Sequence, residues 1–210
     1  RRRVILIGKR DGKPGFYPEF EKVKYNVTVS EILNDLPEIQ AGQGEYHDTL
    51  YKEYTGNYLF ETHIRNGLDF TTQHIARPHT EQDKGIYKLA IEKWDKGERL
   101  NYNDIPQEWQ SHRNTKSFCD RFKVVAADLP HSQTVVAHIC KDGHYYIHPD
   151  KTQNRSITPR EAARLQTFPD DFFFEGVSEK QSRTAAYKQI GNAVPPLMAE
   201  RIAERLREMI

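Results

Sequence analysis

Four side chains near the middle of the sequence are of the types that coordinate zinc: His138, Cys140, His144 and His148. If residues 134–148 form a hairpin, these four side chains share one of its faces, and the geometry does not forbid a zinc site. Their spacing, however, matches no known zinc-finger pattern. Ordinary exposed strand positions are therefore the preferred interpretation, and the sequence predicts no metal site.

A basic patch precedes these residues and consists of His112, Arg113, Lys116, Arg121 and Lys123. Cationic side chains of this kind can contact phosphates, and an arginine can read a guanine edge. A solvated surface is the alternative interpretation, and charge alone favours it. The formal net charge of the chain is +1, which neither requires nor excludes a nucleic-acid partner.

The composition excludes several classes of protein. Of the 210 residues, 37% are apolar and 29% are charged. No apolar run approaches the roughly 18 residues of a membrane helix, and no signal-peptide pattern opens the sequence. The two cysteines, Cys119 and Cys140, fit a reducing cytoplasm better than a disulfide-stabilised secreted protein. We therefore expect a cytoplasmic location and no membrane partner.

Few regular elements are expected in the first 80 residues. The apolar run Val4–Ile7 predicts a buried strand. Ser30 can cap a short helix over residues 31–36, which stops before Pro37. Residues 40–80 show little periodicity and many polar side chains, so we expect irregular structure there.

Two clearer patterns follow. Thr80 and Asp83 begin a helix that runs to about Asp95 and is ended by Gly97. Residues 134–148 predict a hairpin with a three-residue loop. The apolar face of this hairpin would consist of Val135, Ala137, Ile139, Tyr145 and Ile147.

The last third of the sequence is strongly helical. Thr158-Pro159-Arg160-Glu161 is a capping box with proline at the first helical position, and it predicts a helix over residues 160–167. Ser178 and Gln181 form a second capping box, whose helix would reach residue 189 or 190 with Gly191 as its terminator. A final helix begins at Pro195-Pro196 and carries an apolar stripe formed by Met198, Ala199, Ile202, Ala203, Leu206, Met209 and Ile210.

Three stretches carry a resemblance to a known family. Residues 155–172 (RSITPREAARLQTFPDDF) and 189–196 (QIGNAVPP) resemble motifs IX and X of DNA (cytosine-5) methyltransferases. Residues 1–8 (RRRVILIG) resemble motif VIII, and Thr134-Val135 resembles the pair that ends the family's variable recognition domain. The three motifs occur in the family's order, so the resemblance covers essentially the whole chain.

The resemblance implies roles in DNA binding. Arg1 and Arg3 would contact the phosphate backbone and the flipped cytosine, a role that suits guanidinium groups. A basic strand end is the alternative interpretation of these two arginines. Thr134 would position the recognition loops against the DNA backbone, although on sequence alone it is simply the start of a strand. Arg113, Lys116, Arg121 and Lys123 would supply phosphate or base contacts.

The resemblance also implies structural and cofactor roles. Arg160, Glu161 and Arg164 would organise the recognition domain against the large domain, with Glu161 and Arg164 forming an i,i+3 pair. Asn192, Ala193 and Val194 would complete the pocket for S-adenosylmethionine, although the same residues could be no more than a turn.

The nucleophile of the family's reaction is missing from this sequence. That reaction uses the cysteine of a Pro-Cys dipeptide, but Cys119 follows Phe118 and Cys140 follows Ile139. We therefore expect the chain to be inactive by itself and to need an N-terminal catalytic half. Because Arg1 is not a methionine, an excised piece of a longer bacterial enzyme is preferred to a separately encoded subunit.

The expected fold is α+β, with short strands and loops followed by helices that return to a missing Rossmann-like domain. Residues 1–15 would be the motif VIII strand, 16–175 the recognition domain and 176–210 the motif X region. The expected partners are double-stranded DNA and the catalytic half. A stand-alone DNA-binding module is the rival hypothesis, but it would have no use for motif X.

Overall fold

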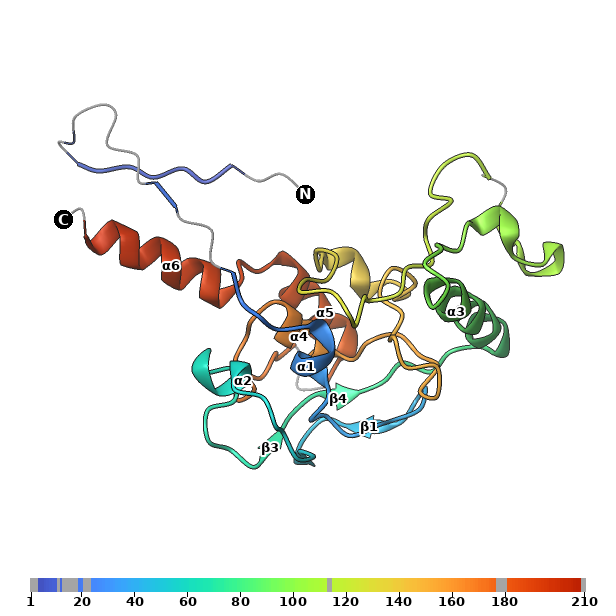
Figure 1. Cartoon of the computed structure of the whole chain (residues 1–210), viewed down its shortest axis with the longest axis horizontal. Helices are drawn as coiled ribbons and strands as arrows, with labels where there is room; N and C mark the ends of the chain where they lie inside the picture. Colours follow the sequence, from blue (N-terminus) through green and yellow to red (C-terminus); the bar gives the residue numbers. More distant parts are fainter. Residues whose placement is uncertain are drawn as a thin grey trace.

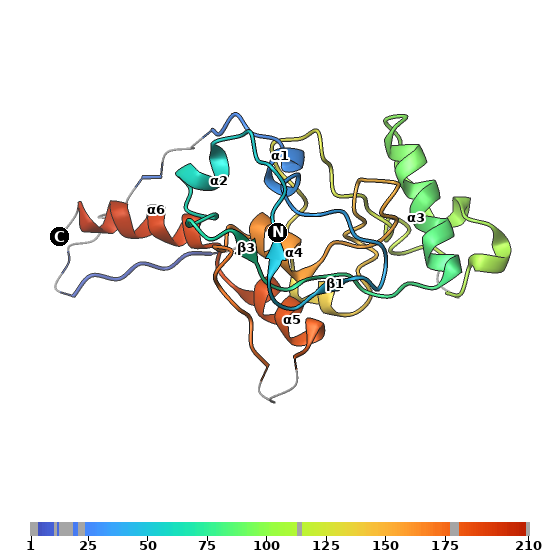
Figure 2. The ribbon, with the colours of Figure 1, turned by 90° about the horizontal axis from the view of Figure 1, so that it is seen from below.

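The structure of the chain is a computed structural model that describes residues 4–10, 12, 19–20, 24–112, 115–176 and 181–208. Short helices and two very small sheets form a central body, from which α3 and α6 extend at opposite ends (Figures 1 and 2). The α-helices are α1 (Val29–Leu33), α2 (Tyr58–Glu61), α3 (Glu81–Trp94), α4 (Pro159–Leu165), α5 (Arg183–Asn192) and α6 (Pro196–Arg207). The strands are β1 (Gly44–Glu45), β2 (Thr49–Leu50), β3 (Phe70–Thr71) and β4 (His74–Ile75), and the 3-10 helices are η1 (Tyr102–Asp104), η2 (Gln107–Trp109) and η3 (Ala137–Cys140).

Both sheets are antiparallel pairs of two-residue strands. β1 pairs with β4, and β2 pairs with β3. At Gly44, where φ is +95°, an added Cβ would lie 2.1 Å from the carbonyl oxygen of His74, so only glycine fits this close approach. The expectation of irregular structure over residues 40–80 therefore missed two short ladders and α2. Two-residue strands are too short to show a periodic pattern.

The larger hydrophobic core lies between α1, α4 and α5. It includes Leu33, Ala162, Tyr187 and Ile190, together with side chains from the segments around residues 125, 135–146, 157 and 174. Because residues far apart in the sequence share this core, α4 lies near the centre of the body (Figure 1).

A second core lies under α3. Ile86, Tyr87, Ala90 and Ile91 face the segments around residues 100–105 and 122–124, and Ile147. The main chain at Ile147 bridges Val124 in parallel and Ser156 antiparallel, and so connects this core to the segment that precedes α4.

The predicted strand Val4–Ile7 is wrong for this structure. Residues 4–9 form no strand in the described part of the chain, and Val4 and Leu6 are 85% and 89% exposed. A strand needs a neighbouring strand to pair its backbone groups, and both ladders in the described part of the chain are built from residues 44–75. Ile5 and Ile7 are half-buried, so the apolar run is partly covered without forming a strand.

The predicted hairpin over residues 134–148 is also wrong. Residues 137–140 form η3, and Ile147 pairs with Val124 and Ser156. The four zinc-type residues therefore do not share a face: His148 is buried beside Glu161, whereas the exposed His138 packs edge-on against Tyr145. Among the described residues, no group of three His, Cys, Asp or Glu side chains could hold a metal ion.

The helix signals succeeded where capping boxes were clear. Thr80 caps α3 and Thr158 caps α4, each with the expected reciprocal hydrogen bonds. α1 begins two residues earlier than expected because Thr28, not Ser30, is its N-cap. No helix within the described ranges is long and apolar enough to cross a membrane.

The start and end of α5 differ from the expectation. Ser178 lies outside the described residues, and Ser182 is the N-cap of the helix. The helix also continues through Gly191 to Asn192, so Gly191 is not its terminator. An added Cβ at Gly191 would lie 2.2 Å from the backbone nitrogen of Ala137. The glycine is therefore needed for close packing of α5 on η3.

Candidate nucleic-acid interface

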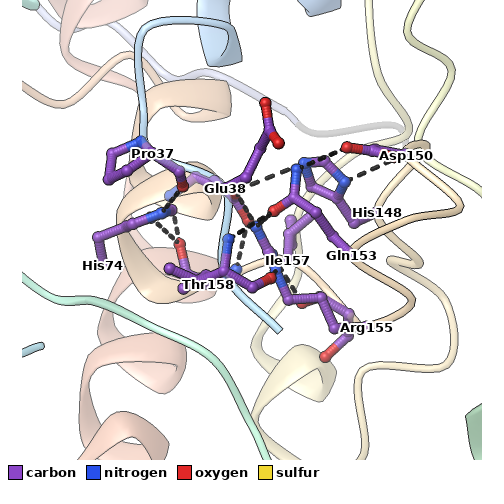
Figure 3. A network of polar contacts seen from close by, with 12 residues as sticks. Pro37, Glu38, His74, His148, Asp150, Gln153, Arg155, Ile157 and Thr158 are labelled. Carbon is purple, nitrogen blue, oxygen red and sulfur yellow. Dashed lines mark hydrogen bonds and ion pairs between the residues drawn. The ribbon is translucent and has the colours of Figure 1, made fainter. Parts of the chain in front are cut away.

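A buried polar network holds the segment before α4 in place. The guanidinium of Arg155 donates to both carboxylate oxygens of Glu161 at 2.7 Å, to the side chain of Gln153 and to the carbonyls of Ile39 and Ser156. Arg155 is fully buried, so a complete set of acceptors is what makes its burial tolerable. Figure 3 shows this cluster around Arg155, Gln153 and His148.

Arg164 is a second buried arginine and lies on α4. Its guanidinium pairs with Asp170, with an N–O distance of 2.6 Å, and with Asp35, which directly follows α1. It also donates to the carbonyl of Ile32 at 2.8 Å. Arg164 and both carboxylates are buried, so this arginine connects α1 to the segment that follows α4.

The other arginine of this helix, Arg160, mainly contacts backbone carbonyls. It donates to the carbonyl oxygens of Thr72, Pro169 and Phe172 at 2.8 to 3.0 Å. Burial lowers its pKa to about 10, so the guanidinium stays charged at neutral pH. Arg160 therefore fixes the loop around Thr72 to the turn that follows α4.

The expected Glu161–Arg164 pair is not formed. Glu161 pairs with Arg155, and Arg164 pairs with the two aspartates. Because the surrounding chain brings carboxylates and carbonyls to every side of α4, each charged residue finds a partner outside its own helix. Arg155, which the sequence reading did not single out, is as deeply buried as Arg160 and Arg164.

Two neutral histidines complete the network. Burial lowers the pKa of His148 to about 4, although Glu161 nearby opposes this shift. Burial likewise lowers the pKa of His74, whose Nε2 donates to the carbonyl of Pro37 at 2.8 Å while Nδ1 lies 3.2 Å from the hydroxyl of Thr158 (Figure 3). For Glu161, burial alone would raise the pKa, but the Arg155 charge holds it well below its usual range. At neutral pH the network is thus ionised at Glu161 and neutral at His74 and His148.

The structure also contains a cavity of about 600 Å³. Two segments that follow one another in the sequence form its walls, one from residues 112–123 and one from residues 133–146. The lining residues are His112, Ser117, Phe118, Arg121, Lys123, Gln133, Thr134, Val136, His138, Asp142, His144, Tyr145 and Tyr146. Three of the residues expected to bind DNA, namely Arg121, Lys123 and Thr134, therefore lie around one cavity.

Arg121 and Lys123 are held by neighbouring groups. The Arg121 guanidinium lies 4.1 Å from the ring centroid of Tyr102 and donates to the carbonyl of Phe118 at 2.9 Å. Lys123 forms an ion pair with Asp120 at 2.7 Å and lies 5.1 Å from the ring centroid of Tyr145. Both cations face the cavity, but each already has partners.

Two tyrosines position the walls of this cavity. Tyr146 donates to the carbonyl of Thr134 at 2.9 Å and accepts from the backbone nitrogen of Val136 at 3.1 Å. Buried Tyr102 accepts from the backbone nitrogen of His112 at 2.7 Å, while its ring contacts Arg121. Sequence reasoning missed both because it searched this region for charge, whereas aromatic residues set the geometry.

The other predicted site residues are distributed differently. Lys116 is exposed and does not line the cavity. Arg1, Arg3 and Arg113 lie outside the described residues. Asn192 ends α5 and is exposed, Ala193 is half-buried, and Val194 is 59% exposed. These last three residues therefore present one exposed edge and not an enclosed pocket.

The known proteins that this chain resembles are DNA methyltransferases. The profile of the family described as C-5 cytosine-specific DNA methylase matches residues 1–208. The chain is 44% identical over 221 residues to the type II methyltransferase M.Bpa9945I of Bacillus paralicheniformis, covering all of this chain and 48% of that protein. It is 29% identical over 210 residues to DNA (cytosine-5)-methyltransferase 4 of Arabidopsis thaliana, covering 88% of this chain and 12% of that protein.

One solved structure is similar in fold. It is described as a DNA modification methyltransferase encoded within a prophage of E. coli, with a TM-score of 0.50 and 22% sequence identity over 91% of this chain. The chain covers 51% of that structure and spans about half the length of the bacterial relative named above.

Proposed function

Since the chain belongs to the C-5 cytosine-specific DNA methylase family, we propose that it is the DNA-recognition part of a methyltransferase. The complete enzyme would transfer a methyl group from S-adenosylmethionine to C5 of a cytosine in a specific DNA sequence. The observation that carries this proposal is the gathering of Arg121, Lys123 and Thr134 around one cavity.

In this proposal the cavity and its rim lie against the DNA. Arg121 and Lys123 add positive charge at the rim, where phosphates of the DNA backbone would approach. Thr134 is exposed, and Tyr146 fixes its carbonyl, so the hydroxyl is presented from a rigid backbone. Arg113 and Lys116 would extend the basic surface, and Arg1 and Arg3 would contact the flipped cytosine and its phosphate.

The network around α4 would hold this interface in position. Arg155, Arg160 and Arg164 connect α1, the loop around Thr72 and the turn at Asp170, and none of them reaches solvent. We assign a positioning role to Arg160, Glu161 and Arg164, because groups this deeply buried touch neither DNA nor cofactor.

Helix α6 supports the proposal of a separate catalytic half. None of its described residues is buried, and Met198, Ile202 and Leu206 remain partly or largely exposed along one side. Covering about 400 Å² of such a surface would stabilise by on the order of 10 kcal/mol before entropic costs. With the chain spanning about half of its bacterial relative, we propose that the N-terminal half of the enzyme covers this face.

S-adenosylmethionine fits this chain only in part. Asn192 and Val194 are exposed, and the N–H of Ala193 is already used by the carbonyls of Gln189 and Ile190. These residues could form one edge of a cofactor site, with the remainder supplied by the catalytic half. The cofactor supplies the methyl group when bound, and this chain only presents the edge that faces it.

Because the catalytic cysteine would belong to the N-terminal half, we expect that the chain alone does not methylate DNA. Neither Cys119 nor Cys140 follows a proline. Tritiated methyl incorporation into mixed-sequence duplex DNA should stay at background for the chain alone. Activity should appear when the chain is mixed with the N-terminal half of the Bacillus relative. Turnover by a variant of the chain lacking both cysteines would contradict the proposal.

DNA binding by the chain alone is the direct test of the interface. Fluorescence anisotropy at several salt concentrations should show binding that weakens steeply with salt. Arg121→Ala and Lys123→Ala should each reduce the magnitude of the salt slope by up to about 1. Lys88→Ala, which changes an exposed lysine of α3 that does not line the cavity, is the matched control and should leave the slope unchanged.

A further inference from the structure

The walls of the 600 Å³ cavity are more aromatic than a surface that only tracks phosphates would require. Phe118 and His112 come from one wall, and Tyr145, His138 and His144 come from the other. Flat rings of this kind provide surfaces on which a nucleobase can stack. The volume also lies within the usual range of a ligand pocket.

Phe118 is the least expected of these residues. Its ring is 71% exposed, and its φ is +57°, a conformation that bulky residues rarely adopt. Arg121 holds this conformation by donating to the carbonyls of Phe118 and Ser117. Backbone strain that the surroundings enforce is typical of functional positions. Here the backbone conformation places a largely exposed apolar ring at the lining of the cavity.

The cavity also has polar side chains that suit the edge of a base, in addition to the two cations at its rim. Lys123 is paired with Asp120, and Arg121 donates to two carbonyls beside the Tyr102 ring, so both cations have fixed positions there. The amide of Gln133 donates to the carbonyl of Tyr145, which leaves its oxygen as an acceptor toward the cavity lining. Hydroxyl, amide and carboxylate groups of Thr134, Gln133 and Asp142 can meet the edge of a base.

We propose that this cavity binds a nucleobase that has left the DNA stack, with Phe118 and Tyr145 as its stacking surfaces. The inference rests on the proposed function and deepens it. The family resemblance assigns the methylated cytosine to Arg1, Arg3 and a catalytic half. The base held here is therefore a second one, such as a base left unpaired opposite that cytosine.

The test compares two labelled duplexes of equal length and charge at fixed salt, one perfectly paired and one with a single bulged base. The full chain should bind the bulged duplex on the order of tenfold more tightly, because the pocket gains a stacked base without the cost of unpairing it. Phe118→Ala and Tyr145→Ala should abolish this preference, and Phe118→Trp should retain it. Thermal unfolding followed by circular dichroism would verify that each variant is folded.

Phe60→Ala is the matched control, because Phe60 is 47% exposed on α2 and does not line the cavity. This variant should keep the preference. Equal affinity for the two duplexes would overturn the proposal of a base-binding pocket, but not the proposed function in DNA recognition. A preference that survives Phe118→Ala and Tyr145→Ala would also overturn it, because the base would then bind elsewhere. Absence of binding to either duplex would instead contradict the proposed function itself.

Discussion

Helices α4 and α6 are built from similar residues but lie in opposite environments. Both begin with proline and carry arginines and glutamate among small or apolar side chains. Six of the seven residues of α4 are buried, including all of its charged ones, whereas no described residue of α6 is buried. Buried charge is tolerable in α4 because each guanidinium has carboxylate or carbonyl acceptors around it. The partners of a helix, more than its composition, determine its environment.

The two helices also depend on different kinds of contact. The centre of the body depends on polar groups that must all be paired, so loss of one partner leaves another charge buried. Hydrogen bonds at its start and along its side attach α6 to the rest of the chain: the backbone N–H of Leu197 donates to the Thr167 hydroxyl, and the Arg201 guanidinium donates to the Tyr25 hydroxyl. Changes in α4 should therefore affect folding, and changes in α6 should affect association.

The largest expected effect is that of Arg164→Met. Asp35 and Asp170 would remain buried without their cation, which typically costs about 3–5 kcal/mol in the free energy of unfolding. Urea denaturation followed by circular dichroism measures this loss. Arg201→Met on exposed α6 is the control and should leave the midpoint unchanged. Equal midpoints for the two variants would contradict the contrast between the two helices.

Acid should destabilise the body because it contains histidines that are neutral in the folded chain. His148 has a pKa of about 4 when folded, against about 6.5 when unfolded. The unfolded chain therefore binds more protons as pH falls through this window. Stability is fully present above about pH 6.5 and is lost toward pH 4, by about 2 kcal/mol at pH 5 for this histidine.

Urea denaturation at a series of pH values tests whether the unfolding free energy falls as the pH falls. His148→Asn should reduce the change of the unfolding free energy between pH 7 and 5, because it removes one side chain that must stay neutral in the folded chain. His131→Gln, at an exposed position, should leave the dependence as it is. His79, whose pKa burial also lowers to about 4, should account for part of the remaining slope. Unfolding free energy that does not change from pH 7 to 5 would show that these histidines are not held neutral.

A smaller effect is expected where α5 packs on η3. Gly191→Ala would place its Cβ 2.2 Å from the backbone nitrogen of Ala137. The two backbones must separate, which should cost about 1–3 kcal/mol of unfolding free energy. Asn192→Ala, at the next and exposed residue of the helix, serves as the control in the same denaturation experiment. An unchanged unfolding free energy for Gly191→Ala would show that α5 and η3 do not pack this closely.

The smallest expected effect on stability is that of Ile202→Ser combined with Leu206→Ser in α6. Neither side chain is buried, so the unfolding free energy of the chain should change by no more than about 0.5 kcal/mol per site. Association with the N-terminal half should nevertheless weaken, as measured by sedimentation velocity of the mixture. Unaltered association would mean that the catalytic half covers another face.

Local sequence signals determined the starts of three helices and indicated the family. The capping boxes at Thr80 and Thr158 correctly start α3 and α4, and Pro195-Pro196 starts α6. These signals work because the hydrogen bonds of a helix start lie within three or four residues of each other. The motifs around residues 155–172 and 189–196 indicated the family for the same reason, since each motif is contiguous.

Only the tertiary structure decided the partners of the charged residues and the shape of the cavity. The sequence pairs Glu161 with Arg164 along the helix, but the partners of that arginine are Asp170 and Asp35, the second of which is 129 residues away. Alternating apolar residues over 134–148 predicted a hairpin, yet Ile147 pairs instead with Val124 and Ser156. Alternation specifies which residues seek burial but not which distant backbone receives their hydrogen bonds. Long-range packing makes that choice, and it also brings the segments around residues 118 and 145 together at one cavity.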